Sequence, residues 1–240
     1  MWYTRAMAGT WWHGATRRLL DTVFPPKCVG CTARGDWFCP TCLRRVERLS
    51  LPLCGICAQP VDPAGPPHGC RRASAALTTI FAVGAYMGPL REAVHALKYH
   101  GRHGVAATLA ALLAPAVAPL LHEGDLLVPV PLHPTRERAR GYNQSAILAS
   151  ELQYLLPVDL APAALRRTRA TADQTALKAV QRVANVRGAF TAQADVVSGR
   201  RVWLLDDVYT TGATLRAGAR ALRDAGAREV RGAVVAIASG

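Results

Sequence analysis

The chain has 240 residues, of which 50% are hydrophobic and 19% are charged, and its formal net charge is +13. This apolar content supplies a real core, so the chain is not too polar to fold, and its length fits one large domain or a medium domain with a small appendage. The positive charge favours anionic partners, namely nucleic acid, phosphorylated metabolites or an acidic membrane surface. Arginine supplies nearly all of it, since lysine occurs only at positions 27, 98 and 178; a compositional bias toward alanine and arginine explains much of the charge equally well.

The N-terminal segment lacks the continuous apolar region of a secretory signal, because arginine and histidine interrupt it. Its periodicity predicts a helix over Thr10–Phe24 that ends before Pro25 and Pro26, and we assign residues 1–26 to this N-terminal helix. The most lipid-like segment, Val105–Leu121, is short for a membrane span and carries two prolines. We expect a buried helix that ends at Pro115, no membrane span, and a cytoplasmic protein.

All seven cysteines fall between Cys28 and Cys70, which marks a separate small module that we assign to residues 27–75. The first four form two C-x2-C turns, and two such turns supply a closed tetrahedral site for a structural zinc ion. A disulfide framework fits poorly with an odd number of cysteines. The expected ligands of this first site are Cys28, Cys31, Cys39 and Cys42.

A third C-x2-C turn suggests a second zinc site, whose expected ligands are Cys54, Cys57, His68 and Cys70. From the spacing alone, a crossed arrangement is also open, in which the C-x2-C turns are paired differently between the two sites. So small a module has little core of its own, so metal binding would supply most of its folding free energy.

From about residue 78 onward, apolar runs alternate with helical patterns. This alternation predicts an α/β domain over residues 78–240, with a mostly parallel sheet covered on both faces. The expected strands are Ile80–Tyr86, Leu126–Val130, Val202–Leu205 and Val230–Ile237. The expected helices are Pro89–Leu97, Val105–Ala114, Asn143–Leu156 and Ala213–Ala225. The basic stretch Arg166–Gly188 is weakly periodic and predicts a long loop with some helix.

The segment Val202–Leu215, VWLLDDVYTTGATL, places two aspartates and three threonines at the exit of an expected strand. Ligands of open α/β sheets bind beyond the carboxyl ends of the strands. Asp206 and Asp207 offer acceptors for sugar hydroxyls, and the turn into the following helix offers backbone N–H and threonine donors for a phosphate. The pattern is typical of a ribose 5-phosphate site; the alternative is a plain turn in which an aspartate caps the helix.

This segment resembles the signature of type I phosphoribosyltransferases, which bind 5-phosphoribosyl 1-pyrophosphate (PRPP). Together with other motifs it resembles the ComF family, which joins a double zinc ribbon to a phosphoribosyltransferase domain and is associated with competence and DNA uptake. These motifs are LKYHGR (97–102), VPVPLHPTRERARGYNQSAILA (128–149), LRRTRATADQTALKAVQRVANVRGAF (165–190) and the cysteine ribbon. The resemblance runs from about Thr16 to the C-terminus. One departure is Pro67, which stands where the second ribbon usually has a cysteine: either His68 replaces the missing thiolate, or the second site is degenerate.

The resemblance implies a role for each part of the site. Asp206 and Asp207 would bind the ribose hydroxyls, and the 5-phosphate would be bound by Thr210, Thr211, Gly212, Ala213 and Thr214. The loop after the strand Leu126–Val130 would bind pyrophosphate through Arg136, Arg138 and Arg140. A flexible loop with Arg166, Arg167, Arg169, Gln174 and Arg182 would close over the site. Lys98, Tyr99 and Gly101 would lie near the base-side hood.

Two functional hypotheses follow. In the first, the protein transfers phosphoribose from PRPP to a nitrogen acceptor with Mg²⁺ and releases pyrophosphate, and Asp206, Asp207 and Arg140 act in catalysis. His95, His100 and His133 are candidates for a general base by residue type only. In the second, the same fold serves as a non-catalytic sensor of PRPP or nucleotides, or binds single-stranded DNA or competence proteins. The acceptor base and the oligomeric state do not follow from the sequence.

Overall fold

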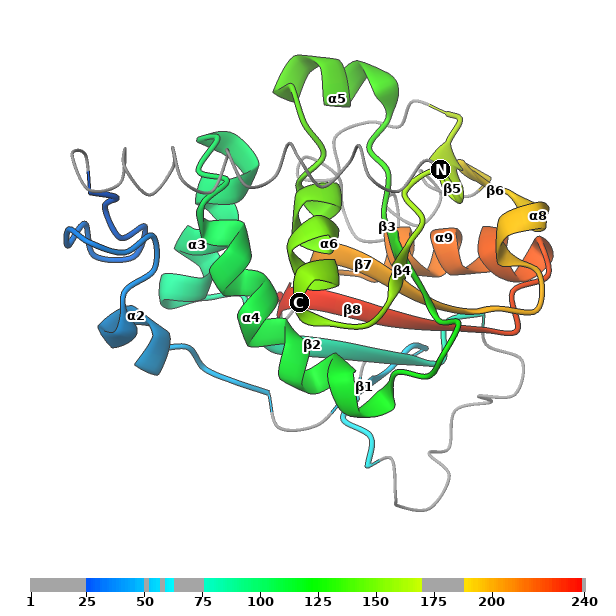
Figure 1. Ribbon diagram of the computed structural model, residues 1–240, viewed down its shortest axis with the longest axis horizontal. Coiled ribbons are helices and arrows are strands. Elements are labelled where there is room, and N and C mark those ends of the chain that lie inside the picture. Colours follow the sequence, from blue (N-terminus) through cyan, green and yellow to red (C-terminus); the bar gives the residue numbers. More distant parts are fainter. Residues whose placement is uncertain (1–24, 50–51, 57–58, 63–75, 170–187, 239–240) are drawn as a thin grey trace, which may run out of the picture.

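The computed structural model describes residues 25–49, 52–56, 59–62, 76–169 and 188–238. In this part of the chain the main sheet has six strands in the order β1-β2-β8-β7-β3-β4 (Figure 1). All neighbouring strands are parallel except β1, which runs antiparallel to β2. The strands are β1 (Leu53–Cys54), β2 (Thr79–Ala85), β3 (Leu126–Pro129), β4 (Asp159–Leu160), β7 (Arg201–Tyr209) and β8 (Glu229–Ile237). The predicted α/β architecture with a mostly parallel sheet is confirmed.

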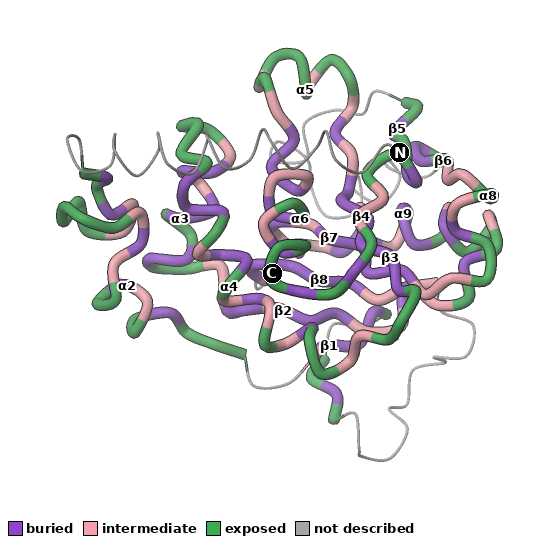
Figure 2. The backbone as a smooth tube through the Cα atoms, viewed as in Figure 1, coloured by how far each residue is buried: buried purple, intermediate pink, exposed green. Residues whose placement is uncertain are grey.

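Helices cover both faces of this sheet. The side chains of each strand point alternately to the two faces, and each face carries its own hydrophobic cluster. Trp203 and Leu205 of β7 pack in the cluster that contains α3 (Gly88–Tyr99), α4 (Val105–Val117) and α6 (Gln144–Leu155). Val202 and Leu204 face the other side, where α9 (Ala213–Asp224) packs. The tube in Figure 2 shows β7 and β8 buried along most of their length.

Four regions differ from the sequence prediction. Helix α4 does not end at Pro115 but continues to Val117, followed by a short 3-10 helix, η2 (Ala118–Leu120). Pro115 removes the hydrogen bond that a backbone N–H at this position would donate to the carbonyl of Ala111, and the helix ends two residues later. Strand β7 does not end at Leu205 but extends to Tyr209, since it pairs with β8 over its whole length.

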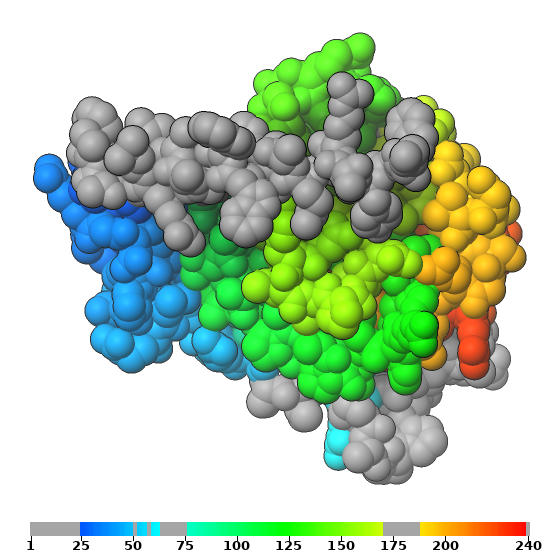
Figure 3. Space-filling model, viewed as in Figure 1, coloured from blue at the N-terminus to red at the C-terminus, as the bar shows by residue number. Residues whose placement is uncertain are grey.

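The third difference is the region after β3, which we expected to be a loop. It contains a helix, α5 (Pro134–Arg140), that buries none of its residues and projects from the body (Figures 1 and 3). His133 caps this helix, since its Nδ1 accepts a hydrogen bond from the backbone N–H of Thr135 at 3.3 Å. At its other end Gly141 adopts the left-handed conformation that terminates helices.

The basic stretch after residue 165 begins as a strand rather than a loop. Strand β5 (Leu165–Arg167) pairs with β6 (Phe190–Ala192) in a small antiparallel sheet beside α9. A short helix, α8 (Ala194–Val197), then leads into β7. Gln174 and Arg182 lie outside the described residues, as does most of the N-terminal helix that we predicted for residues 1–26.

The N-terminal module and the α/β domain share one core. Cys28, Phe38 and Cys42, the last of these in α2 (Pro40–Arg44), belong to the same buried cluster as α3 and α4. Residues 47–49 and β1 also run antiparallel along the free edge of β2. The close approach requires Gly84, because a Cβ there would lie 2.2 Å from the carbonyl oxygen of Glu47. The domain boundaries 27–75 and 78–240 stay predictions.

Among the described residues no helix is long and apolar enough to cross a membrane.

Candidate zinc centre and active site

The first four cysteines come together as their spacing predicts. The sulfur atoms of Cys28, Cys31, Cys39 and Cys42 all lie within 4.8 Å of one another. Backbone N–H groups of Cys39 and Gly30 donate to the sulfur of Cys28, at 3.3 and 3.4 Å. Burial acts to raise the pKa of Cys28, but these hydrogen bonds outweigh it and lower that pKa to about 6. A glycine is needed at position 30, since a Cβ there would lie 2.9 Å from the sulfur of Cys42.

This cluster fits a structural zinc ion, because four thiolates leave no position open for water. The second expected site is only partly visible. Cys54 is buried at the end of β1, whereas Cys57, His68 and Cys70 lie outside the described residues. A second zinc ion therefore stays a prediction.

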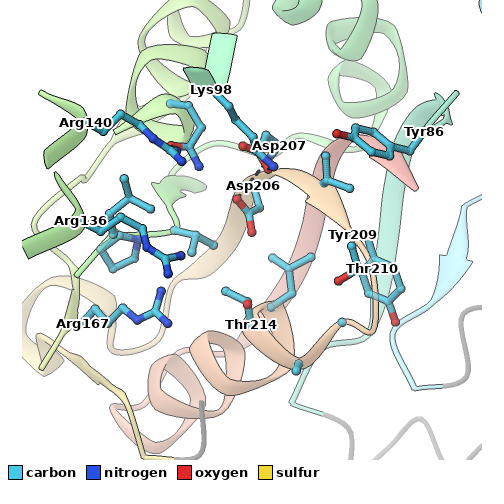
Figure 4. A pocket seen from close by; sticks show the side chains of 18 of the residues that line it. Tyr86, Lys98, Arg136, Arg140, Arg167, Asp206, Asp207, Tyr209, Thr210 and Thr214 are labelled. Atoms are coloured by element: carbon cyan, nitrogen blue, oxygen red, sulfur yellow. Dashed lines mark hydrogen bonds and ion pairs between the residues drawn. The ribbon is translucent and has the colours of Figure 1, made fainter. Parts of the chain in front are cut away.

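A cavity of about 230 Å³ opens at the carboxyl ends of the parallel strands. Figure 4 shows three arginines on one side of it, the acidic pair of β7 in the middle, and the turn into α9 on the remaining side. The lining residues are Tyr86, Lys98, Tyr99, Val130, Pro131, Leu132, Arg136, Arg140, Gln144, Arg167, Asp206, Asp207, Val208, Tyr209, Thr210, Gly212, Ala213, Thr214 and Leu215. Most of the predicted site residues thus converge, from segments that are far apart in the sequence.

The cavity exists because β3 is shorter than β7. The last pair between them joins Pro129 to Leu205, so within the described part of the chain no strand pairs with β7 on that side from Asp206 onward. Asp206 and Asp207 project to opposite faces of β7 because side chains alternate along a strand. Oδ1 of Asp206 accepts hydrogen bonds from Oγ of Ser145 and from the backbone N–H of Asp207, both at 2.9 Å.

Asp207 is only 3% exposed and forms an ion pair with Lys98 of α3, with 2.8 Å between Oδ1 and Nζ. Its other oxygen, Oδ2, is buried and accepts no hydrogen bond from the described residues. Burial favours the neutral form of Lys98, but the charge and hydrogen bond of Asp207 outweigh this effect and raise the pKa of Lys98. Burial, followed by the neighbouring charge of Asp207, raises the pKa of Asp206 to about 7.

The arginine side of the cavity is built by α5 and β5. Arg136 and Arg140 are one helical turn apart and both reach the cavity, whereas Arg138 is exposed on another side of α5 and does not line it. Arg140 donates to Oε1 of Gln144 and its guanidinium lies 5.2 Å from the ring centre of Tyr99. Burial and the nearby charge of Arg136 lower the pKa of Arg167. Cations gathered in this way suit an anion with several charges.

The third side is the turn from β7 into α9. Gly212 has φ +70°, and a Cβ there would lie 2.4 Å from the ring of Tyr209, so only glycine fits. Arg216 holds the turn by donating to the hydroxyl of Tyr209 at 3.1 Å and to the carbonyl of Thr211. Thr210, Ala213 and Thr214 line the cavity, but Thr211 does not, and its Oγ1 accepts from the backbone N–H of Ala213 at 3.4 Å.

Other candidates lie outside the cavity. Arg166, Arg169 and Gly101 do not line it, nor do the three histidines. His95 packs against Tyr99, with 4.7 Å between ring centres, and the ring of His100 lies 5.3 Å from that of His95. His133 caps α5. None of the three is therefore placed as a general base in this structure.

The sequence interpretation missed the partners of the acidic pair. Lys98 was expected near the base-side hood, and Ser145 was not considered. The signal that could have found Ser145 is the run Gly141-Tyr142-Asn143-Gln144-Ser145, since polar residues in the connection after a parallel strand often face the ligand site. Asn143 caps α6 through the N–H of Ser145 and donates to the carbonyl of Val130, which fixes this run at the end of β3.

The raised pKa of Asp206 leads to a prediction for stability. A carboxyl group whose pKa is higher in the folded than in the unfolded chain stabilises the fold at low pH, and this contribution is lost as the pH rises from about 4 to about 7. We expect the free energy of unfolding of Asp206→Asn, relative to that of the unchanged protein, to increase as the pH rises through this range, by at most about 1.4 kcal/mol per pH unit. Urea unfolding of both proteins at several pH values measures the difference; a difference independent of pH would contradict the assignment.

Comparisons with known proteins agree with this architecture. Residues 19–73 match the family model of the double zinc ribbon domain, and residues 139–239 match that of the phosphoribosyl transferase domain. Competence protein F of Haemophilus influenzae is 30% identical over 217 residues, which cover 85% of this chain and 94% of the relative. The DNA utilization protein YhgH of Salmonella typhimurium is 36% identical over 207 residues, which cover 83% of this chain and 90% of that protein.

Two further proteins are less similar to this chain. Competence protein ComFC of Bacillus subtilis is 25% identical over 195 residues, covering 78% of each chain. A solved structure of an allosteric regulatory enzyme of purine biosynthesis aligns with a TM-score of 0.41 and 23% identity, over 59% of this chain and 30% of that enzyme. Given its two domain matches and the near full-length relatives, the chain belongs to the ComF family, in which a double zinc ribbon precedes a phosphoribosyltransferase domain.

Proposed function

We propose that the cavity binds PRPP and that the protein transfers its phosphoribosyl group to a nitrogen acceptor. The observation that carries this proposal is the convergence of three chemically different walls on one cavity, an acidic pair, a set of arginines and a glycine-containing turn at a helix start. PRPP is a ligand with three matching parts, its ribose hydroxyls, its pyrophosphate and its 5-phosphate.

In this proposal each wall has one task. The carboxylates of Asp206 and Asp207 accept hydrogen bonds from the ribose hydroxyls and orient the sugar. The turn from Thr210 to Thr214 binds the 5-phosphate through backbone N–H groups and the threonine hydroxyls, at the positive end of α9. Arg136, Arg140 and Arg167 compensate the charge of the pyrophosphate.

The reaction breaks the bond between C1 of the ribose and the pyrophosphate oxygen, which keeps the electron pair. The lone pair of the acceptor nitrogen then forms the new bond to C1, and a proton of that nitrogen leaves to solvent. The arginines stabilise the charge that develops on the departing pyrophosphate, so their contribution is greatest in the transition state. Mg²⁺ bound to PRPP would add further positive charge at the pyrophosphate and the ribose hydroxyls. The carboxylate-rich centre of the cavity is compatible with a ligand that carries such a cation.

Calorimetry with PRPP, with and without Mg²⁺, tests binding. We expect saturable binding of PRPP, weaker binding of ribose 5-phosphate and of pyrophosphate, which each use part of the cavity, and no binding of unphosphorylated ribose. Binding of none of the phosphorylated ligands would remove the basis of the proposal. Release of pyrophosphate on addition of single nucleobases then measures transfer.

The second candidate is a binding module that senses PRPP or nucleotides, or that binds single-stranded DNA, in the cytoplasm. The net charge of +13 and the names of two relatives, which refer to DNA utilization and competence, favour this candidate. PRPP binding without pyrophosphate release for any nucleobase would support a sensor. Fluorescence anisotropy of a labelled oligonucleotide, with and without PRPP, shows whether DNA competes for the same cavity.

A further inference from the structure

Lys98 is the cation that lies against the acidic pair, and it comes from a different part of the chain. Its Nζ lies 2.8 Å from Oδ1 of Asp207, and only 19% of its side chain is exposed. In Figure 4 it extends from the helix above toward the two aspartates, whereas the three labelled arginines lie on another side of the cavity. The pair therefore joins α3 directly to β7 within the cavity wall.

The surrounding structure holds Lys98 in this position. Leu97, its neighbour in the last turn of α3, is fully buried, and its carbonyl accepts a hydrogen bond from the hydroxyl of Tyr142 at 2.5 Å. Three residues later, Ser145 donates to Asp206. The stretch 142–145, which runs from the connection after α5 into the first turn of α6, thus fixes both the helix that presents Lys98 and the second carboxylate of the pair.

The two carboxylates need such a cation if both are to accept hydrogen bonds from one sugar. Adjacent carboxylates in a partly buried site repel each other, and one of them then tends to hold a proton. Lys98 occupies only Oδ1 of Asp207. Oδ2 remains buried, accepts no hydrogen bond from the described residues and belongs to a residue that lines the cavity.

We propose that Lys98 is a positioning residue for PRPP, which fixes Oδ1 of Asp207 through their ion pair and leaves Oδ2 to accept a hydrogen bond from a ribose hydroxyl. This inference rests on the proposed function. By this inference a residue of the chain, Lys98, supplies part of the positive charge that the two aspartates require. The charged and titratable groups that line the cavity around the pair are Lys98 and Tyr99 of α3, Tyr86 after β2, Arg136 and Arg140 of α5, Arg167 of β5 and Tyr209 of β7.

The test compares Lys98→Met, which keeps the length of the side chain and removes the charge, with Arg91→Met. Arg91 lies on the same helix, is exposed and pairs with Glu92, so it controls for loss of one positive charge on α3. PRPP binding is measured by calorimetry from pH 6 to pH 9. We expect Lys98→Met to bind at least about tenfold more weakly at pH 7, with recovery toward pH 9, where the carboxyl group of Asp206 ionises without Lys98. Arg91→Met should bind like the unchanged protein.

This pH profile distinguishes positioning from a merely structural role. PRPP is the same in every titration, so its own ionisation cancels when the variants are compared. A loss of affinity that is equal at all pH values, or no loss, would overturn the inference. Lys98→Arg retains the charge and should keep the pH profile of the unchanged protein.

A measurement without ligand separates this inference from the proposed function. Lys98 acts to lower the pKa of Asp206, so Lys98→Met should move the NMR titration midpoint of the Asp206 carboxyl upward by about one pH unit. If the unchanged protein does not bind PRPP but this shift occurs, the proposed function fails, whereas the charge pairing of Lys98 stands. If Lys98→Met does not fold, Tyr142→Phe, which removes the bond to Leu97, should produce a smaller shift in the same direction. No shift in either variant would overturn the inference.

Discussion

Replacement of both aspartates by asparagine, in Asp206→Asn/Asp207→Asn, should weaken PRPP binding by about 100-fold or more. Hydrogen bonds to charged groups contribute about 1.5–3 kcal/mol each, and the double variant removes two charged acceptors that a sugar would use. The effect should be larger than that of any single arginine replacement, since Arg136, Arg140 and Arg167 share one anion among them. Calorimetry with PRPP and Mg²⁺ measures the change.

Two controls keep this experiment interpretable. Asp195→Asn removes an exposed carboxylate from α8 and should leave PRPP binding unchanged. Asp206→Asn alone retains acceptors for Ser145 and for the N–H of Asp207, so it should fold normally and lose only part of the affinity. The double variant also leaves Lys98 without its carboxylate, and a thermal melt shows how much stability that costs. Unchanged binding in a folded double variant would contradict the site assignment.

Replacement of Cys42 by serine should cause the largest loss of stability. Cys42 is fully buried, belongs to the four-cysteine cluster and packs in the core that α3 and α4 also share. Structural zinc contributes about 10–16 kcal/mol to the folding of isolated zinc-finger peptides, so loss of one thiolate ligand removes much of the free energy that folds the module. We expect Cys42→Ser to contain about one zinc ion less per chain than the unchanged protein and to melt at a clearly lower temperature.

Elemental analysis of the purified protein and thermal unfolding check this result. Thr41→Ala alters the exposed neighbour of Cys42 and serves as the matched control, with unchanged zinc content and melting temperature. Because the module shares its core with α3, the melting of the whole protein should change, not only that of a separate part. An unchanged zinc content in Cys42→Ser would show that this cluster does not hold the ion.

The sequence predicted the elements whose patterns are local. The apolar runs of β2, β3 and β8 alternate with helical periodicity, and the C-x2-C spacing brought four sulfur atoms together as expected. Strand β7 was predicted too short because Asp206 and Asp207 look like the start of a loop when their long pairing with β8 is not known. The start and stop signals of α5, His133-Pro134 and Gly141, were present, but a helix with no buried side resembles a loop by hydrophobic pattern.

The contacts that complete the site could not be predicted in this way. Lys98 meets Asp207, 109 positions later in the chain, only because tertiary packing brings the last turn of α3 beside β7. Arg138 was expected in the cavity with its neighbours, but the helical turn of α5 directs Arg136 and Arg140 inward and leaves Arg138 exposed. Such contacts depend on tertiary packing, which cannot be predicted from residue type and spacing alone.

The edge of β2 is paired with residues 47–49 and with β1, and this pairing bears on the solubility of the protein. An uncovered edge strand presents unpaired N–H and C=O groups that can bind a strand of another molecule. Here the backbone of the N-terminal module pairs with Val83–Ala85 and with Thr79–Ile80, and so covers most of the edge of β2. Loss of the metal would loosen this cover and expose an apolar strand to intermolecular pairing. We therefore expect a zinc ion at the four-cysteine cluster to protect the sheet against aggregation, although the cluster lies outside the sheet itself.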